Sequence, residues 1–428
     1  MREALLHMIW KTKRVSLHDL KTTEGVPVQI IHHGVHNHDA GPDFLNAKVQ
    51  IGDTLWAGHV EIHVKSSDWH KHQHHHDPAY NNVILHVVHE DDKPIANEKG
   101  RSIPTITLED RIPERYIRDH DILLQSLSWI PCAATLPTLN QDKWPFYLER
   151  LLVQRLEAKH DRIRDLLDKT TYDWEEVLYK LILRYMGLKV NGDAFEMLSD
   201  CLPYAILKKQ APQLIQLEAL LLGQAGLLRD ADEYTTRLLR EYTHLKNKHT
   251  LHPMTGVEWK FSKLRPANFP TLRMAQVAAL YHKTPQLFSA LVEASDSSAM
   301  ASLFKVQASA YWDQHFIPAK TSSTTKTKVI GATTIQVLLI NVVAPLLFAY
   351  GTAKGEAALR IKATDLLSDL KAEKNGIINR WKEHGLHPDS AAQSQALLEL
   401  KTHYCDKLRC LDCSIGQQII FTGVSHPE

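Results

Sequence analysis

The chain has 428 residues, of which 44% are hydrophobic and 23% charged. This composition is typical of a soluble globular protein, and the length is too great for one ordinary hydrophobic core, so we expect two or three domains. Fifty basic residues stand against forty-nine acidic ones, and the formal net charge is +1. This balance excludes an overall positive field, so a nucleic-acid partner is possible only through a local basic patch.

The cellular compartment is predicted from the apolar stretches and the cysteines of the chain. Charged residues break any export signal near the start, and five cysteines, three of them clustered, do not make a disulfide scaffold. The longest apolar run, 335–350, contains Asn341 and Pro345 and is shorter than the roughly 20 residues of a spanning helix. We therefore expect a buried core helix there, no membrane partner and a cytoplasmic protein.

The first third of the chain is predicted to form short strands after an initial helix. Apolar spacing predicts a helix at 3–11 and strands at 26–32, 44–51 and 55–65, with Gly52-Asp53 as a hairpin turn between the last two. After a polar segment, the nearly continuous apolar run 82–90 is typical of a strand covered on both faces. A short strand at 103–108 closes this region.

From about residue 140 the pattern becomes helical. Helical spacing of apolar residues predicts further helices at 174–186, 214–222, 274–281, 286–294, 335–350, 357–381 and 391–404. No repeat of fixed period is seen, which argues against a solenoid. We therefore predict an α+β protein. A small mixed α/β sheet domain at 1–130 precedes a larger all-α domain at 131–428, which ends in a cysteine cluster.

Potential catalytic residues lie on two neighbouring strands. Glu61, His63 and Lys65 share one face of the strand at 55–65 because successive side chains alternate, and Asp43 opens the preceding strand. Two carboxylates on adjacent strands can bind a divalent cation that keeps positions open for water and a phosphate. His63 or Lys65 can then orient or deprotonate the attacking water. The alternative is a solvated polar strand face.

This arrangement resembles the PD-(D/E)xK nuclease superfamily. The resemblance implies a restriction-endonuclease-like core of helix, three-stranded meander, helix and strand, with Mg²⁺- or Mn²⁺-dependent cleavage of nucleic acid. By position, it implies that Asp43 and Glu61 bind the metal and that His63 stands where the family usually has lysine. Lys65, one strand period later, can supply the missing amine. The resemblance depends on Pro42-Asp43 and Glu61-x-His63, and the histidine departs from the family's pattern.

Histidine is the compositional anomaly, because thirteen of the 26 lie between His32 and His89. Imidazoles and carboxylates at this density can hold Zn²⁺, Mn²⁺ or Fe²⁺. We expect a functional polar cleft with the following candidate lining residues: His36, His38, His59, Asp68, Trp69, His70, His72 and His86. Such a cleft would also suit a zinc-dependent small-molecule hydrolase, or a non-enzymatic binding or scaffold protein. The run at 72–76 is also typical of a solvated loop.

A second potential metal site lies near the C-terminus, with the spacing Cys405-x₄-Cys410-x₂-Cys413. Three thiolates can occupy three corners of a Zn²⁺ site or bind three irons of a [4Fe–4S] cluster. Cys132 is the first candidate for the fourth ligand, and His403 is the second. With four protein ligands the site would be structural and would tie the chain end to the first domain. The alternative is a set of plain thiols at a helix end.

Longer stretches of the chain also carry a resemblance. Residues 41–69, 81–92, 217–228 and 264–276, together with the terminal cysteine cluster, resemble a bacterial family known as domain of unknown function 2851. The resemblance covers nearly the whole chain, and its motifs are specific. It implies a soluble bacterial protein and supplies no activity. The prediction of a metal-dependent, nuclease-like hydrolase therefore depends on the site residues themselves.

Overall fold

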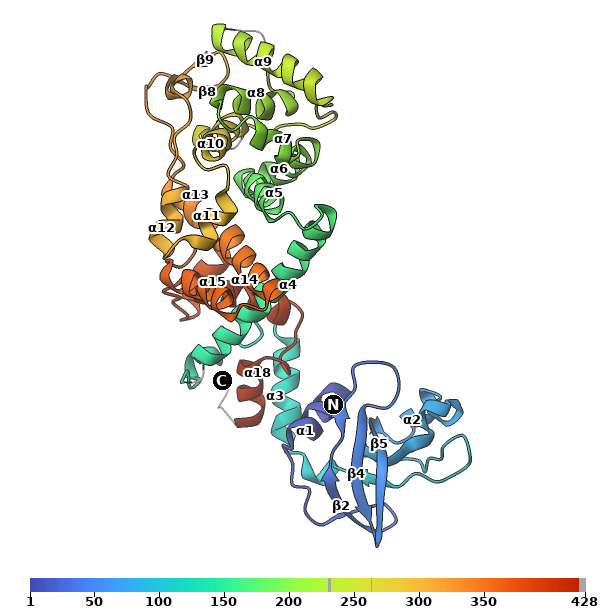
Figure 1. Cartoon of the computed structure of the whole chain (residues 1–428). Helices are drawn as coiled ribbons and strands as arrows, with labels where there is room; N and C mark the ends of the chain where they lie inside the picture. Colours follow the sequence, from blue (N-terminus) through green and yellow to red (C-terminus); the bar gives the residue numbers. More distant parts are fainter. Residues whose placement is uncertain (143, 230–231, 263, 423–428) are drawn as a thin grey trace. The chain divides into compact units, whose positions relative to one another are not determined.

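The computed structural model describes residues 1–142, 144–229, 232–262 and 264–422, and the chain divides into two compact units (Figure 1). The first unit contains Met1–Tyr147, Glu383–Gly385 and the segment from Leu400 onward, and the second contains Leu148–Lys382 and Leu386–Glu399. The first unit carries a mixed sheet, and the second is helical apart from one small hairpin, so the predicted α+β class is confirmed.

The division of the chain differs from the expected boundary at residue 130. The first unit extends to Tyr147, and the C-terminal segment with its cysteine cluster belongs to it rather than to the helical unit. The reason is helix packing within the first unit. Helix α18 (Ser414–Thr422) packs against α3 (Glu114–Gln125), and the Tyr116 and Phe421 rings meet edge to face at 5.0 Å.

The sheet of the first unit has the order β1-β2-β4-β5-β6-β7, with β3 paired to β4 on the side. The strands are β1 (Leu20–Lys21), β2 (Pro27–His32), β3 (Val35–His36), β4 (Phe44–Ile51), β5 (Thr54–Lys65), β6 (Val83–Glu90) and β7 (Thr105–Thr107). Neighbours from β1 to β5 are antiparallel, whereas β5–β6 and β6–β7 are parallel. The five strands expected from the sequence are thus confirmed, with small shifts at their ends.

The middle of β5 is buried on both faces. Val60 and Ile62 are fully buried, as their apolar character predicts, but Glu61 and His63 are only 4% and 1% exposed. Helix α1 (Glu3–Thr12) packs against β5, and the segment after β5 folds over the polar face. The alternative of a solvated polar strand face is therefore wrong.

The parallel crossover from β5 to β6 is made by short helices rather than one long helix. They are α2 (Asp68–Lys71) and the 3₁₀ turns η1 (His74–His76) and η2 (Pro78–Asn82). Trp69 and Tyr80 anchor this polar segment in a small core that includes Val83, Ile95 and Ile103. The two parallel strands also approach closely at Gly58, where a Cβ would lie 2.4 Å from Ile84 Cγ2.

The remaining elements are mostly helices of the second unit. The first unit adds the 3₁₀ turns η3 (Glu109–Arg111) and η4 (Leu136–Thr138) and the π-helical turn η8 (Leu400–Cys405). The second unit holds most of α4 (Trp144–Lys169), α5 (Trp174–Met186), α6 (Leu188–Cys201), α7 (Tyr204–Lys209), α8 (Leu214–Gln224), α9 (Glu233–His249), η5 (Pro266–Asn268), α10 (Pro270–Lys283), α11 (Leu287–Glu293), α12 (Ser297–Leu303), η6 (Ala310–Gln314), the hairpin β8 (His315–Ile317) and β9 (Lys320–Thr321), α13 (Ala332–Leu338), the π-helical turn η7 (Leu339–Val343), α14 (Ala344–Lys354), α15 (Ala357–Asp369), α16 (Gly376–Glu383) and α17 (Ala391–Glu399).

Two expectations about the helices need correction. The helix expected at 357–381 is split into α15 and α16, because Lys371 pairs with Ser390 in an isolated bridge that ends α15. The apolar run 335–350 lies in a longer helical stretch, Ala332–Lys354, of 23 residues. The π-helical turn η7 widens this stretch just before Pro345, so the missing proline N–H is accommodated.

By length and composition, Ala332–Lys354 is the one described helical stretch that could cross a membrane. Within the second unit, however, 67% of its most apolar window is buried, and the core helix of a soluble protein has the same properties. The burial agrees with the predicted core helix.

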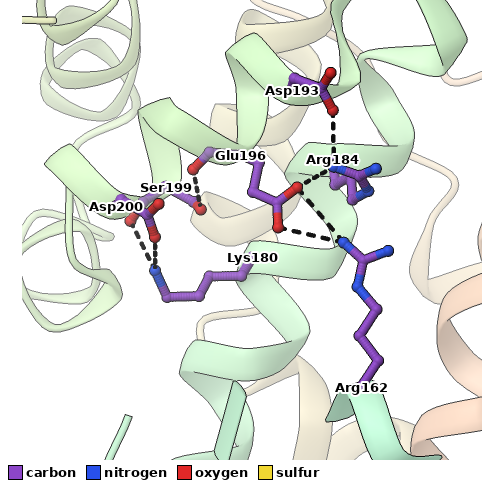
Figure 2. A network of polar contacts seen from close by, with 7 residues as sticks. All are labelled: Arg162, Lys180, Arg184, Asp193, Glu196, Ser199 and Asp200. Carbon is purple, nitrogen blue, oxygen red and sulfur yellow. Dashed lines mark hydrogen bonds and ion pairs between the residues drawn. The ribbon is translucent and has the colours of Figure 1, made fainter. Parts of the chain in front are cut away.

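Figure 2 shows a network of charged side chains that joins α4, α5 and α6. Glu196 accepts from Arg184 and lies 3.2 Å from Arg162, and Arg184 also lies 3.1 Å from Asp193. Lys180 contacts Asp200 at 2.7 Å. Each charge in the figure thus meets an opposite charge, and Glu196 is one-third exposed at 34%. The network holds three helices in register at the surface.

Candidate functional site

The register of β4 and β5 brings Asp43 and Glu61 together. Phe44 pairs with Val60, so Asp43, one residue earlier, reaches the position beside Glu61. The Asp43 backbone N–H donates to Glu61 Oε2 at 3.1 Å, and the Ile62 N–H donates to Asp43 Oδ2 at 2.9 Å. The two carboxylates predicted from the sequence are therefore held next to each other by reciprocal backbone hydrogen bonds.

This pair of carboxylates is electrostatically unfavourable without a cation. Burial, followed by the charge of Asp43, raises the pKa of Glu61 to about 9. Without a metal, the surroundings of Glu61 therefore favour the protonated carboxyl. A divalent cation beside both carboxylates would lower this pKa and bind a fully charged pair.

Three histidines complete the cluster. His63, His72 and His74 can each offer one nitrogen such that the three atoms all lie within 4.8 Å of one another. Glu61 Oε1 lies 3.5 Å from His63 Nε2 and 3.2 Å from His74 Nε2. With metal–ligand bonds of about 2.0–2.2 Å, neighbouring ligands around one ion lie roughly 3–3.5 Å apart. The distances from Glu61 to His63 and His74 are of that size, as is the 3.2 Å between His63 Nε2 and His72 Nδ1.

His86 orients His63 from behind. His63 Nδ1 lies 2.8 Å from His86 Nε2, and both side chains are almost fully buried. Burial and the neighbouring histidines lower the pKa of His63 to about 2, and burial lowers that of His86 to about 3. Both rings are therefore neutral at physiological pH. If His63 Nδ1–H donates to His86, the lone pair of His63 Nε2 is directed into the cluster, as a metal ligand requires.

Aromatic side chains hold the third histidine in place. The Tyr80 ring stacks on His74 with centroids 3.8 Å apart, and Trp69 meets His74 edge to face at 5.4 Å. Trp69 is itself fixed by donating from Nε1 to the Ala96 carbonyl at 3.0 Å. His72 is exposed whereas His63 is buried, so the cluster is closed at one end and open to solvent at the other.

Sequence reasoning missed two residues of α1 and undervalued His74. His7 Nε2 lies 3.2 Å from Asp43 Oδ2. Burial opposes the charge of His7, but the hydrogen bond to Asp43 and its charge raise the pKa of His7 overall. Burial raises the pKa of Glu3, whose carboxyl also feels His7 and Asp43. The available signal was the i, i+4 spacing of Glu3 and His7 on a helix whose other face is apolar.

Lys65 does not join the carboxylate pair. Its amine lies 2.9 Å from Glu90 Oε1 at an exposed position, and its backbone N–H donates to Asp68 Oδ2 at 3.2 Å. Hydrogen bonding to Glu90 raises the pKa of Lys65. Lys65 and Asp68 therefore have their contacts at the end of β5, away from the site around Glu61.

The other candidate lining residues divide into two groups. His59 Nδ1 accepts from the Asn46 backbone N–H at 3.3 Å, and the His70 ring lies 4.7 Å from that of His75, so these two have other partners. His36 and His38 stack edge to face at 4.4 Å and line a cavity beside His7.

That cavity has a volume of about 310 Å³ and a basic lining. Arg2, which precedes α1, lines the cavity together with His7 and Lys11 of α1. The loop between Cys405 and Cys413 contributes Arg409 and Asp412, which pair at 2.9 Å. His120 also lines it. This side chain is 3% exposed, and its Nδ1 has no hydrogen-bond partner in the described part of the chain. The cavity therefore presents positively charged side chains, and a buried imidazole lies in its wall.

Comparison with known proteins adds a family and no activity. The family model described as "Protein of unknown function (DUF2851)" matches residues 3–376. No curated protein and no solved structure matches the chain.

Proposed function

The chain belongs to the family described as protein of unknown function (DUF2851), and from its site we propose a metal-dependent hydrolase that cleaves phosphodiester bonds in nucleic acid. The convergence of Asp43 and Glu61 with the histidine set His63, His72 and His74 carries this proposal. A cluster that combines neutral imidazoles with a protonated buried carboxyl is poised to exchange a proton for a cation.

The ligand types favour Mn²⁺ over Mg²⁺. Magnesium prefers oxygen ligands and keeps several waters, whereas manganese, iron and zinc accept imidazole nitrogen as well. Asp43 and Glu61 supply oxygen, and the three histidines supply nitrogen. The bound ion would activate a water and neutralise charge on a phosphate oxygen.

The chain's own residues would position the ion and handle the proton. His86 sets the tautomer of His63, and Tyr80 fixes the ring of His74. Because Glu90 engages Lys65, this lysine does not take the proton of the attacking water, and the proton would leave to solvent at the exposed, open end of the cluster.

Two features support a phosphodiester substrate. The first is the basic cavity, which His7 lines. Arg2 and Lys11 also line this cavity and supply positive charge that can bind a phosphate. The element order α1, three antiparallel strands, a crossover and the parallel β6 also agrees with the core that the nuclease resemblance implies.

The test is cleavage of end-labelled single- and double-stranded DNA and RNA with Mn²⁺, Mg²⁺ or Zn²⁺. We expect metal-dependent cleavage by the wild type and by Asp53→Asn, which changes an exposed residue of the β4–β5 turn. Glu61→Gln should lose about a hundredfold or more, because it removes a proposed ligand. Equal background from the wild type and Glu61→Gln with every metal would reject the proposal.

A second candidate, zinc-dependent hydrolysis of a small molecule, is favoured by the size of the cavity. A volume of about 310 Å³ lies at the lower end of the range of small-molecule sites. Chromogenic phosphodiesters and carboxylic esters, assayed with Zn²⁺, separate the two candidates. Turnover of these small esters with no cleavage of any nucleic acid would favour the second.

A further inference from the structure

Two contacts in the first unit bracket the four cysteines. The Lys401 amine lies 5.0 Å from the centroid of the Trp129 ring, and Gln418 Nε2 donates to the Asn140 carbonyl at 3.2 Å. Cys132 lies between Trp129 and Asn140 in the chain, and the other three cysteines lie between Lys401 and Gln418. The fold therefore brings together two cysteine-bearing segments that are far apart in the sequence.

The thiols are concentrated in a nearly buried spot. Cys132, Cys410 and Cys413 are 7–8% exposed, and Cys405 is half-buried. Burial is the largest cause that raises the pKa of Cys405, and the charges of Cys132, Cys413 and Cys410 raise it further. The four thiols are therefore close enough to interact electrostatically. None of the four forms a disulfide in the described chain.

The loop that carries the cysteines is held by turns rather than by a helix or a strand. Between Cys405 and Ser414 the loop consists of turns. Leu408 in this loop is 42% exposed and has a left-handed backbone conformation, with φ at 52°. Tight packing is confined to its end, where a Cβ on Gly416 would lie 2.1 Å from the Cys410 carbonyl oxygen. A loop of turns with buried thiols is of the kind that metal binding stabilises.

From this placement we propose that Cys132, Cys405, Cys410 and Cys413 bind an iron–sulfur cluster that fastens the C-terminal segment to the first unit. This centre is separate from the histidine and carboxylate site, and the inference does not rest on the proposed hydrolase activity. With four cysteine ligands it has no open coordination position, so its role is structural.

The arrangement of the thiols favours a cluster over a single zinc ion. Around one tetrahedral zinc, with Zn–S bonds of about 2.3 Å, each pair of sulfurs lies roughly 3.8 Å apart. In the part of the chain that the structure describes, the ligand set that gathers within 4.8 Å is His63, His72 and His74, and the cysteines are not such a set. A polynuclear cluster is larger than one ion, and it holds its cysteine sulfurs farther apart.

The centre also has a consequence for the basic cavity. The loop between Cys405 and Cys413 supplies Leu408, Arg409, Leu411 and Asp412 to one wall of that cavity. Loss of the cluster should therefore release this wall while the ligands around Glu61 stay in place.

The experiment is metal analysis of the full chain, purified and reconstituted without oxygen in the presence of iron, sulfide and zinc. We expect iron and acid-labile sulfide in equal amounts, with the charge-transfer absorption of a thiolate-bound cluster. Both should be lost in Cys410→Ser and in Cys132→Ser. Cys201→Ser is the matched control, because Cys201 ends α6 in the helical unit, and it should keep both.

Three results would overturn the inference. Wild-type protein without metal would reject the centre, and zinc without iron would reject the cluster. Full iron content in Cys132→Ser would reject the four-cysteine ligand set and favour a local site, for which His403 is the alternative ligand. The first two results need no variant, so they decide even if the serine variants fail to fold.

Discussion

Two polar clusters in this molecule differ in how their charges are satisfied. In the α4–α6 network, Glu196 meets Arg162 and Arg184, and Lys180 meets Asp200, at positions that remain partly exposed (Figure 2). In the β4–β5 cluster, Glu61 is 4% exposed beside a second carboxylate. In the first cluster, positive and negative side chains pair with one another. In the second, the buried carboxyl of Glu61 lies beside the carboxyl of Asp43.

This difference indicates which of the two clusters is a binding site. A balanced surface network needs nothing more and contributes little beyond helix register. Burying the Glu61 carboxyl beside the half-buried Asp43 and the neutral ring of His63 costs free energy, which binding of a cation would offset. Substitutions in the buried cluster should therefore change metal binding strongly, whereas substitutions in the surface network should change stability only slightly.

The largest effect should come from removing a central imidazole. His63→Asn should weaken Mn²⁺ or Zn²⁺ binding by about a hundredfold or more, because the buried ring lies within contact of Glu61, His72 and His86. Isothermal titration calorimetry measures this. His59→Asn on the same strand is the control and should bind metal normally. Equal affinities in both variants would show that the histidine set is not a ligand set.

The next effect concerns the residue behind the cluster. His86→Leu should weaken metal binding by roughly 10–100-fold, because His63 would lose the partner that fixes its tautomer. The ion should still bind, which distinguishes this positioning residue from a ligand. Wild-type affinity in His86→Leu would remove it from the site.

The third prediction is a pH dependence of the metal-free protein. The pKa of Glu61 is raised from 4.5 to about 9 on folding. Its stabilising contribution is therefore complete below pH 4.5 and is lost as the pH rises toward 9, by up to about 1.4 kcal/mol per pH unit. His63, with its lowered pKa, contributes in the opposite sense and loses stability as the pH falls from 6.5 toward 2.

Between pH 6.5 and 9, the difference in unfolding free energy between the wild type and Glu61→Gln isolates the Glu61 contribution. Denaturant unfolding at several pH values should show the wild type losing stability relative to Glu61→Gln across this range. Saturating Mn²⁺ should remove the effect, since the metal replaces the proton. Parallel curves without metal would contradict the raised pKa.

A smaller effect is expected at the rim of the basic cavity. Lys11→Gln should weaken nucleic-acid binding for all sequences and reduce the slope of log affinity against log salt concentration by about 1. Lys13→Gln, two residues away at the end of α1, is the matched control and should change neither. Fluorescence anisotropy at several salt concentrations provides the measurement. An unchanged slope in Lys11→Gln would exclude this cavity from phosphate binding.

The smallest effect belongs to the balanced network. Glu196→Gln should destabilise the protein by less than about 1 kcal/mol, because its ion pairs are partly exposed. Metal binding and activity should be unchanged. A loss of several kcal/mol in thermal unfolding would show that the network supports the helical unit more strongly than a surface pair does.

Local patterns in the sequence predicted what local physics determines. The strand at 44–51 and the helix at 174–186 were predicted with the bounds that the structure shows, and the hairpin brought Asp43 beside Glu61. Side-chain alternation also placed Glu61 and His63 on one face. These results depend on neighbours a few residues apart or on a turn of fixed length.

What the sequence did not reveal depends on tertiary contacts. His7 reaches Asp43 because α1 packs on the sheet, and His74 is fixed by stacking on Tyr80, so neither role has a signature in its own segment. The break between α15 and α16 accompanies pairing of Lys371 with the distant Ser390, although Asn375-Gly376 is a local turn signal at the start of α16. The same holds for the return of the C-terminal segment to the first unit.

The discontinuity of the first unit has a consequence for synthesis on the ribosome. The 281 residues from Ala133 to Cys413 must be added before the cysteine segments can meet. At about 5–20 residues per second, this interval lasts from roughly 14 to 56 seconds. During that time the nascent sheet lacks α18 and the loop that walls the basic cavity, and the Glu61 cluster exists without its finished surroundings. The unit that begins folding first is therefore the one completed last.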